Sequence, residues 1–520
     1  MALSTAKYIE MLEHENAEFK QLVGDVPKLR FELESQQDQI KTVVNKQEAL
    51  IQTQRALIAS QKDLIQKQEA TIKALEARVK DLEARLAKNS QNSNKPSSQD
   101  GYKKPNPKSE RGKSGKTSGG QPGHQGHTLK QVEHPDHIER HAVGVCCAEC
   151  QCSLEGIAAT IETRQEFEIP PLKVTVTEHQ VEVKKCKKCG HVNKADAPIS
   201  APAQYGKCVE ALAVYLTQYQ FLPLNRTREF FADLLGLHLS EGTLVNMTRR
   251  CHIELAGFES TVKEALIKAK LAHFDESGLK VKKLLQWLHV ACTSKLTCYH
   301  LDLKRGSKAM NRMGILPNFT GTAVHDNFKS YYDEAYKCAH SLCNAHHLRE
   351  LRFHEEEYQQ IWCGEMRSLL LTMRKSVEDH LSRGETALPQ QLYESFKEHY
   401  FNLLMKALDE IPKMPAREPG KKGKQKNHSA YNLWSRLINQ RDEALAFLKD
   451  FTIPFTNNQA ERDIRMIKTK QKVSGCFRSD EGGKMFCRIR GFISTARKQG
   501  HNIFDALIDA CKGTPFIPVH

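Results

Sequence analysis

The chain has 520 residues, of which 39% are hydrophobic and 27% charged, with only 19 Pro and 29 Gly. This composition excludes a collagen-like chain and a chain disordered from end to end, and the length predicts three or more domains. Lys and Arg outnumber Asp and Glu by 77 to 62, a net charge of +15, which favours a polyanionic partner such as nucleic acid.

Neither a membrane-spanning segment nor an export signal is visible in the sequence. No apolar run approaches the roughly 18–20 residues that a spanning helix needs, and the amino-terminal stretch carries acidic residues without an apolar core. We therefore expect a cytoplasmic, nucleoid-associated protein. In that reducing compartment the 16 Cys are expected as thiols or metal ligands rather than disulfides.

Residues 1–88 carry a heptad pattern. An apolar residue recurs every seven positions, in the order Val44, Ile51, Ile58, Ile65, Ile72, Val79 and Leu86. The residue three positions after each of these is glutamine in the first four heptads and leucine in the next two. This a/d pattern predicts one long helix that self-associates as a coiled coil. The alternative is a single amphipathic helix folded onto its own protein, and the glutamine column defines no single oligomeric state.

Residues 89–130 are rich in Ser, Asn, Gly, Pro and Lys and nearly lack apolar side chains. Such a segment cannot bury enough surface to offset its ordering entropy, so we expect a flexible linker. Between residues 103 and 130 it carries seven basic residues against one acid, Glu110. A flexible basic tether also suits nonspecific contact with phosphates.

Two Cys-x-x-Cys pairs in residues 131–200 predict a zinc ribbon. Cys147 and Cys150 form the first pair, and Cys186 and Cys189 form the second. Two knuckles at this spacing are typical of a structural Zn²⁺ site, and the alternating residues 167–185 between them predict a β-hairpin. Cys146 and Cys152 flank the first pair, which leaves the register of that knuckle open.

Residues 201–260 predict a helix-turn-helix-like DNA-binding region. Two helical stretches are separated by a turn at residues 237–239, and Ser240 is suited to cap the second helix. Arg249 and Arg250 are candidates for phosphate contacts.

Residues 261–480 predict an α/β domain with a carboxylate metal site. Three strand-like runs, a helix and a fourth short strand follow one another, the order that opens an RNase H-like fold. Asp275 lies on the first strand and Asp326 at the end of the fourth, and these strands are neighbours in such a sheet. Their oxygen ligands favour Mg²⁺ or Mn²⁺.

A third carboxylate is expected from a helix beyond the sheet. Residues 336–450 are helical in pattern and predict an inserted helical subdomain, and residues 481–520 a helical tail. Glu461 follows the insertion, with Arg462 and Arg465 beside it. Asn458 and Glu461 also have the spacing of a capping box, which is the structural alternative for Glu461.

The motifs in this order resemble the large transposases of the insertion-sequence 66 family, a branch of the DDE transposases. The resemblance covers nearly the whole chain. It rests on GGQPGHQGH, the paired Cys-x-x-Cys motifs, FLPLNRTREFF, LSEGTLVN, HFDESG, VHDNF, CNAHHLREL, NNQAERDIR and SGCFRSDEGG. Two positions depart from the family pattern: Ser277 replaces the usual Thr, and Asn327 the usual Gly.

The resemblance implies that Asp275, Asp326 and Glu461 are the catalytic triad of a DNA transposase, binding Mg²⁺ or Mn²⁺. A two-metal site of this kind hydrolyses DNA at the ends of a mobile element and then joins the freed 3′-hydroxyls to target DNA. Arg462 and Arg465 would hold phosphates. The expected partners are DNA, further copies of the chain and accessory proteins of the same element. No membrane partner is expected.

Other interpretations stay open from the residues alone. The chain could be a catalytically inactive DNA-binding regulator, or a metal-dependent nuclease that cuts without joining. Asp302, Asp333 and Glu276 are competing carboxylates, and Glu276 should point to the opposite face of its strand from Asp275. Cys343, His346 and His347 indicate a packed helix with histidines near DNA rather than a second zinc site.

Overall fold

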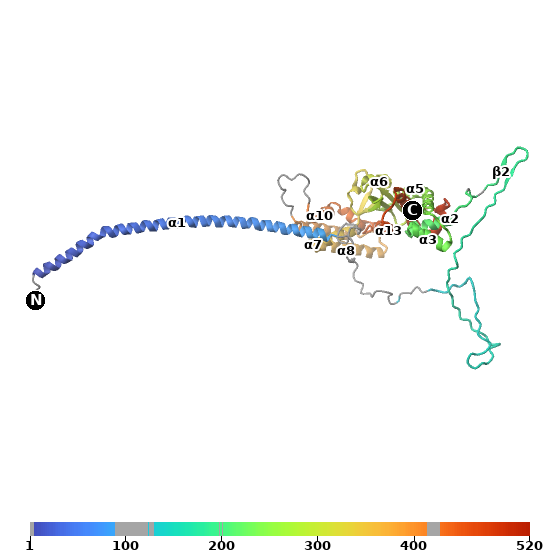
Figure 1. The fold of residues 1–520 in the computed structure, drawn as a ribbon, viewed down its shortest axis with the longest axis horizontal. Coiled ribbons are helices and arrows are strands. Elements are labelled where there is room, and N and C mark those ends of the chain that lie inside the picture. The colour runs from blue at the N-terminus through green and yellow to red at the C-terminus, as the bar shows by residue number, and fades with distance from the viewer. Residues whose placement is uncertain are drawn as a thin grey trace. The chain divides into compact units, whose positions relative to one another are not determined.

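The computed structural model describes residues 5–88, 123, 129–196, 198, 199, 201–412 and 427–519. The predicted linker at 89–130 therefore lies almost wholly outside the described residues, as does most of the basic loop at 413–428. The chain divides into two units at Lys88, and each is described by itself. Figure 1 shows the elements of both units in chain order.

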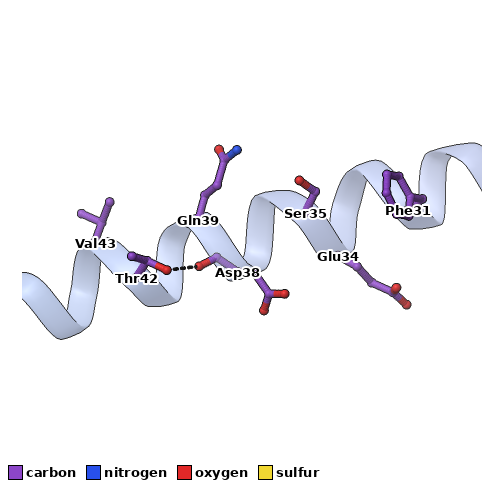
Figure 2. A pocket seen from close by; sticks show the side chains of 7 residues that line it. All are labelled: Phe31, Glu34, Ser35, Asp38, Gln39, Thr42 and Val43. Carbon is purple, nitrogen blue, oxygen red and sulfur yellow. Dashed lines mark hydrogen bonds between the residues drawn. The ribbon is translucent and has the colours of Figure 1, made fainter.

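The first unit is one continuous helix, α1 (Thr5–Ala87), of 83 residues. The seven a-position side chains of its heptads are all exposed, from 43% for Val44 to 86% for Leu86. Figure 2 shows a shallow hollow on this helix between Phe31 and Val43, where Thr42 donates a hydrogen bond to the Asp38 carbonyl oxygen at 2.8 Å. The helical prediction for residues 1–88 is confirmed over the described residues.

The second unit begins with two small knuckles. Strands β1 (Val183–Lys185) and β2 (Val192–Lys194) pair antiparallel on either side of the Cys186 knuckle. The hairpin predicted over residues 167–185 is wrong, because only its last three residues form a strand. The side chains of Ile169 and Val176 are 78% and 89% exposed, so the alternating pattern there has no packed surface to bury against.

Helices follow, with a break between α3 and α4 at the predicted turn and with α5 extending past residue 260. They are α2 (Lys207–Val214), the π-helix η2 (Tyr215–Tyr219), α3 (Leu224–Leu235), α4 (Glu241–Glu254) and α5 (Ala256–Ile267). α3 ends at Gly236, whose φ of 65° suits glycine, and the Ser240 hydroxyl caps α4 by accepting the Thr243 N–H at 3.0 Å. Cys251 of α4 and Phe258 of α5 belong to the hydrophobic core beneath the sheet.

A five-stranded mixed sheet organises the second unit. Its strands are β3 (Leu271–Val281), β4 (Leu284–Cys292), β5 (Thr297–Asp302), β6 (Thr322–His325) and β7 (Ala339–Leu342). The order is β5-β4-β3-β6-β7, with β3, β4 and β5 antiparallel and β6 and β7 parallel to β3. The three predicted strands and the fourth short strand are all present, whereas β7 was not predicted.

The two faces of the sheet have different cores. On one face, Leu279 and Val281 of β3 pack with α13 (Asn458–Ser474). On the other, Ala272 and Phe274 pack with α5 and with α6 (Ser307–Met313). Successive strand residues point to opposite faces, so Asp275 lies on the α13 side and Glu276 on the α5 side.

Between β7 and α13 the described residues form six helices that have a core of their own. They are α7 (Asn344–Tyr358), α8 (Ile361–Ser382), α9 (Gln390–Glu410), α10 (Ser429–Asn439), α11 (Arg441–Ala444) and α12 (Ala446–Lys449). Trp362, Leu370, Tyr400 and Leu433 lie in that core. Within the described residues, none of the helices is both long and apolar enough to cross a membrane.

The last two helices complete the main core. α14 (Asp480–Lys498) packs along β5, and α15 (Ile503–Cys511) packs on α2. Phe492 and Leu507 are buried among residues of the sheet and of α5. The segment 481–520 is therefore packed into the core of the second unit and does not extend from it as a tail.

Candidate active site

Asp275 and Asp326 lie at the same level of two neighbouring parallel strands. The register pairs Leu271 with Thr322 and His273 with Val324. Continued by two residues along both strands, this register brings Asp275 opposite Asp326, which directly follows β6. Two carboxylates that are far apart in the sequence therefore meet at one point of the sheet.

The surroundings of Asp275 disfavour its charged form. Burial, followed by the carboxylates of Glu276, Asp326 and Glu461, raises the pKa of Asp275 well above its usual range, and His346 opposes the rise. Since these groups act on Asp275 electrostatically, they lie near it in space. Several carboxylates at one partly buried position are stabilised by a bound cation.

Asn457 fixes the start of α13 to the strand that carries Asp275. Its Nδ2 donates to the Phe274 carbonyl oxygen at 2.8 Å, so its Oδ1 accepts from His273 Nδ1, also at 2.8 Å. Burial lowers the pKa of His273, which keeps the ring neutral with its proton on Nδ1. The Asn457 backbone N–H donates to Cys343 Sγ at 3.1 Å. The first turn of α13 is thereby held against both β3 and the start of α7.

The capping box, the structural alternative for Glu461, does not form between Asn458 and Glu461. Asn457 takes the cap position but its side chain bonds to β3, so Asn458 moves into the first turn and the helix has no side-chain cap. Glu461 Oε1 is buried without a hydrogen-bond partner, and Glu461 Oε2 lies 4.0 Å from Arg349 Nη2. The Glu461 carboxylate is therefore free of a capping role.

A second group of potential ligands includes Glu461. Sγ of Cys343, a ring nitrogen of His346 and a carboxylate oxygen of Glu461 all lie within 4.8 Å of one another. Burial lowers the pKa of His346, but the adjacent Cys343 and, more weakly, Asp326 raise it to about 9 overall. Cys343 and His346 lie on one turn at the start of α7, so α7 and α13 together form this group.

His347 takes no part in this group. Its ring is buried and Nδ1 lies 3.0 Å from Asn344 Oδ1, and burial lowers its pKa to about 3. The sequence pattern had treated His346 and His347 alike, and the structure separates them. Arg349 and Asn457 were not identified from the sequence, although Cys343, His346 and Arg349 are spaced by three residues and so share one helix face.

The competing carboxylates have other roles. Tyr331 donates to Glu276 Oε2 at 2.7 Å and Arg305 Nη2 lies 2.8 Å from Glu276 Oε1, on the opposite face of β3 from Asp275, as alternation predicts. Burial, with a contribution from Asp326, raises the pKa of Glu276 to about 7. Asp302 accepts a forked pair of hydrogen bonds from Arg312, at 2.6 and 2.5 Å.

Asn327 explains one departure from the family pattern. Its φ is 71°, in the left-handed region where glycine is most at ease and asparagine is tolerated. Its Nδ2 donates to Gln440 Oε1 at 2.7 Å. The sharp turn that follows Asp326 is therefore kept without glycine.

The four candidate phosphate-binding arginines fall into two kinds. Arg462 and Arg465 are exposed on α13, and among the described residues neither guanidinium is in an ion pair. Arg249 and Arg250 are in ion pairs. Arg249 Nε lies 2.7 Å from Glu481, and Arg250 Nε lies 3.0 Å from the buried carboxylate of Glu210.

The two Cys-x-x-Cys pairs form knuckles of the same geometry. In the first knuckle, the Cys147 N–H donates to the Cys152 carbonyl oxygen and the Gln151 N–H donates to the Cys147 carbonyl oxygen. In the second, the Cys186 N–H donates to the His191 carbonyl oxygen and the Gly190 N–H donates to the Cys186 carbonyl oxygen. Backbone and side-chain hydrogen bonds within each knuckle lower the pKa of Cys147 and of Cys186. This equivalence favours Cys147 and Cys150 as the first pair. No three of the four sulfurs lie within 4.8 Å of one another in the structure.

Comparisons with known proteins give three family matches. Residues 203–485 match a model described as "Transposase IS66 family", and residues 145–190 match "zinc-finger binding domain of transposase IS66". Residues 25–130 match a family of unknown function. No curated protein matches the chain.

One similar solved structure is a "CryoEM structure of simian T-cell lymphotropic virus intasome in complex with PP2A regulatory subunit B56 gamma". The identity is 13% over 43% of this chain and 74% of that chain, with a TM-score of 0.14.

The family matches support two functions for this chain. The zinc-finger match supports zinc binding near the two knuckles, and the transposase match supports a role in DNA transposition. Since the match over residues 203–485 spans more than half of the sequence, the chain belongs to the IS66 family of transposases.

Proposed function

We propose that the protein is a DDE-type transposase whose catalytic carboxylates are Asp275, Asp326 and Glu461. The observation that carries this proposal is the parallel register of β3 and β6, which aligns the two aspartates beneath the start of α13. Glu461 is on that helix and its charge acts on Asp275. Three acids from three separate elements are thus near enough to interact electrostatically, although their carboxylate oxygens do not all lie within 4.8 Å of one another.

The sheet supports an RNase H-like fold for this catalytic part. Three antiparallel strands followed by a strand parallel to the first are the arrangement expected from the sequence, and β7 adds a further parallel strand. The helices between β7 and α13, with their own core, fit an inserted helical subdomain. In this proposal the inserted helices separate Glu461 from the two aspartates in the sequence. Helix α13, which follows the insertion, packs on the sheet and so places Glu461 near the aspartates.

The residues present fit divalent metal ions with oxygen ligands. Asp275, Asp326 and Glu461 offer the hard carboxylate donors that Mg²⁺ or Mn²⁺ prefers. Glu461 Oε1 is buried without a hydrogen-bond partner, and an unsatisfied buried oxygen of this kind calls for a ligand. Bound Mg²⁺ would supply the activation of a water or 3′-hydroxyl and the neutralisation of charge on the leaving oxygen.

The reaction that fits this site is phosphodiester hydrolysis followed by strand transfer. In the first step a water oxygen bonds to phosphorus, the bond from phosphorus to the 3′-oxygen breaks, and that oxygen takes a proton. In the second step the freed 3′-hydroxyl attacks a phosphorus of target DNA, and a new 3′-oxygen leaves. No residue of the chain becomes covalently attached to DNA, so the carboxylates only hold and orient the reacting groups.

The exposed arginines of α13 are suited to hold the DNA backbone near these carboxylates. Arg462 and Arg465 project from the first two turns of the helix that carries Glu461, and a guanidinium matches two phosphate oxygens at once. Arg249 and Arg250 would have to exchange Glu481 and Glu210 for phosphate, so we assign them a weaker contribution to DNA binding. The ribbon, the basic linker, further copies of the chain and accessory proteins of the element complete the proposed assembly.

The test is Mg²⁺- or Mn²⁺-dependent cleavage and joining of a plasmid that carries the gene with its native flanks. Loss of an outer-shell partner of a metal lowers activity by about 10–100-fold, and loss of a metal ligand should cost no less. We therefore expect the folded Glu461→Gln and Asp326→Asn variants to cut DNA more slowly than the wild type by at least that factor. Glutamine keeps the size of Glu461 and removes the charge that a metal needs.

Asp333→Asn is the matched control for Asp326→Asn. Asp333 Oδ1 accepts the Ala335 N–H at 3.2 Å, which an asparagine oxygen can also do, so this variant should cut like the wild type. Equal cutting by Glu461→Gln and the wild type would place the third ligand elsewhere. If the wild type cuts DNA without joining it, the protein is a nuclease. If it binds the element ends without cutting them, it is a regulator.

A further inference from the structure

The group of Cys343, His346 and Glu461 offers a different metal chemistry from the aspartates. A thiolate, an imidazole and a carboxylate are the donors typical of Zn²⁺ sites, whereas Mg²⁺ prefers oxygen alone. In a tetrahedral zinc site, bonds of about 2.0–2.3 Å hold the ligand atoms roughly 3.3–3.8 Å apart. The observed separations, all within 4.8 Å, need only small side-chain rotations to reach that range.

Two atoms of this group lack partners in the structure. His346 Nδ1 and Glu461 Oε1 are both buried and accept or donate no hydrogen bond among the described residues. Such atoms are rare in folded proteins because they lose water without gaining another partner. An ion bound between α7 and α13 would give Glu461 Oε1 a partner, and His346 as well where it binds through Nδ1.

The third ligand is already held in place. Cys343 is 1% exposed, and its Sγ accepts the Asn457 N–H at 3.1 Å. A backbone N–H that points at sulfur stabilises negative charge on it and fixes its direction, as outer-shell partners of metal ligands do. Glu461 Oε2 lies 4.0 Å from Arg349 Nη2, whereas Oε1 is buried without a hydrogen-bond partner.

We propose that Cys343, His346 and Glu461 form a second Zn²⁺ site, separate from the ribbon, and that zinc bound there withholds Glu461 from the catalytic Mg²⁺. The inhibitory part rests on the proposed function of Glu461, whereas the zinc site itself does not. Three protein ligands leave one position open, as in zinc sites that exchange ligands. Zinc binding displaces the proton from His346, because a metal ligand must be deprotonated.

The first measurement is the zinc content of the purified full-length protein after dialysis against zinc-free buffer. We expect two zinc ions per chain in the wild type, one in Cys343→Ser and one in the ribbon variant Cys186→Ser. Cys338→Ser is the matched control, since Cys338 is also buried and lies five residues before Cys343 without belonging to the group. This control should keep two.

A second variant guards against misfolding of Cys343→Ser. His346→Gln removes a different ligand, and thermal melting shows whether each variant is folded. One zinc ion in the wild type, unchanged by Cys343→Ser, overturns the proposal. Two ions in a folded Cys343→Ser or His346→Gln protein overturn it equally.

The second measurement separates this inference from the proposed function. ZnCl2 is titrated into the Mg²⁺-dependent cleavage reaction of the wild type and of Cys343→Ser. Loss of an outer-shell partner weakens metal affinity by about 10–100-fold, so we expect half-inhibition of Cys343→Ser to need a zinc concentration higher by at least that factor. If the second zinc is found but the wild type never cuts, the zinc site stands and the catalytic assignment fails. If the wild type cuts and zinc inhibits both proteins alike, the catalytic assignment stands and the inhibitory site is excluded.

Discussion

Three aspartates of the sheet show how much a residue's chemistry depends on its neighbours. Asp275 has carboxylates around it, and its pKa is raised well above the usual range by burial and by those charges. Burial also opposes ionisation of Asp302, but hydrogen bonds from Arg312 and the Lys304 backbone outweigh it and lower the pKa to about 2. Asp326 occupies the end of a strand facing Asp275. The sequence favoured Asp275 and Asp326 over Asp302 as metal ligands, and the ion pair of Asp302 with Arg312 gives that aspartate a different role.

Asp302 therefore contributes stability that depends on pH. Its pKa is lower in the folded protein than the usual 3.8, so its contribution is present above about pH 4 and is lost as pH falls toward 2. We expect Asp302→Asn to lower the free energy of unfolding by about 1–2 kcal/mol at pH 7. Urea unfolding should show the same difference at pH 7 and pH 5 and a smaller difference at pH 3. A difference that stays constant down to pH 3 would contradict this role for the carboxylate.

At the scale of the element, the position of α13 decides the site. Asn457 bonds to His273 and to the Phe274 carbonyl on β3, and its N–H bonds to Cys343 at the start of α7. Farther along, Asp463 lies 2.7 Å from Lys498 of α14, a pair in which both side chains are almost buried. These contacts hold Glu461 over the face of β3 that carries Asp275.

Loss of the Asn457 side chain should therefore affect activity more than stability. We expect Asn457→Ala to slow cleavage by about 10–100-fold, as loss of a residue that positions a metal ligand does. Asn502→Ala is the matched control, because Asn502 also makes two side-chain hydrogen bonds, at the cap of α15, and lies outside the site. It should cost about 1 kcal/mol of stability and leave the cleavage rate of the folded protein unchanged. Equal effects of the two variants on cleavage would mean that Asn457 only stabilises the fold.

The knuckles allow a similar test at the same scale. We expect Cys186→Ser to lower the zinc content by one ion per chain and to weaken binding to the element ends, since a structural zinc site contributes folding energy directly. Cys208→Ser is the control, because Cys208 is exposed and lies outside both pairs. Full end binding by a Cys186→Ser protein that has lost its zinc would show that the ribbon does not bind DNA.

At the scale of the whole molecule, α1 presents an apolar stripe that nothing in its own unit covers. The a positions from Val44 to Leu86 are exposed along one continuous helix. Such a stripe is stable in water when a second copy of the helix covers it, which is the basis of the predicted coiled coil.

Disruption of this stripe should lower the oligomeric order. We expect a chain without residues 1–88, and the double variant Ile58→Glu with Ile65→Glu, to remain folded with at most about half the wild-type mass by light scattering. The double variant Ser60→Glu with Gln66→Glu, which adds the same two charges away from the a and d positions, should keep the wild-type mass. An unchanged mass for both disrupted proteins would argue for a helix that does not self-associate.

The sequence by itself determined the features that depend on local pattern. The heptads predicted the long helix, the turn at residues 237–239 and Ser240 predicted the break between α3 and α4, and alternation placed Asp275 and Glu276 on opposite faces of β3. The motifs also identified the family that the comparisons established. In these cases the signal lies within one turn, one strand or one short motif, so no distant contact is needed to interpret it.

The tertiary structure decided what depends on contacts between distant segments. The spacing of Asn458 and Glu461 allowed a capping box as the alternative. Instead, Asn457 occupies the cap position without capping the helix, because its side chain bonds to a strand about 180 residues earlier, which a local pattern cannot reveal. The alternating residues 167–185 predicted a hairpin, but a strand forms only where another strand satisfies its backbone hydrogen bonds. Cys343, His346 and Glu461 meet because α7 and α13 begin side by side, and the sequence carries no signal for that meeting.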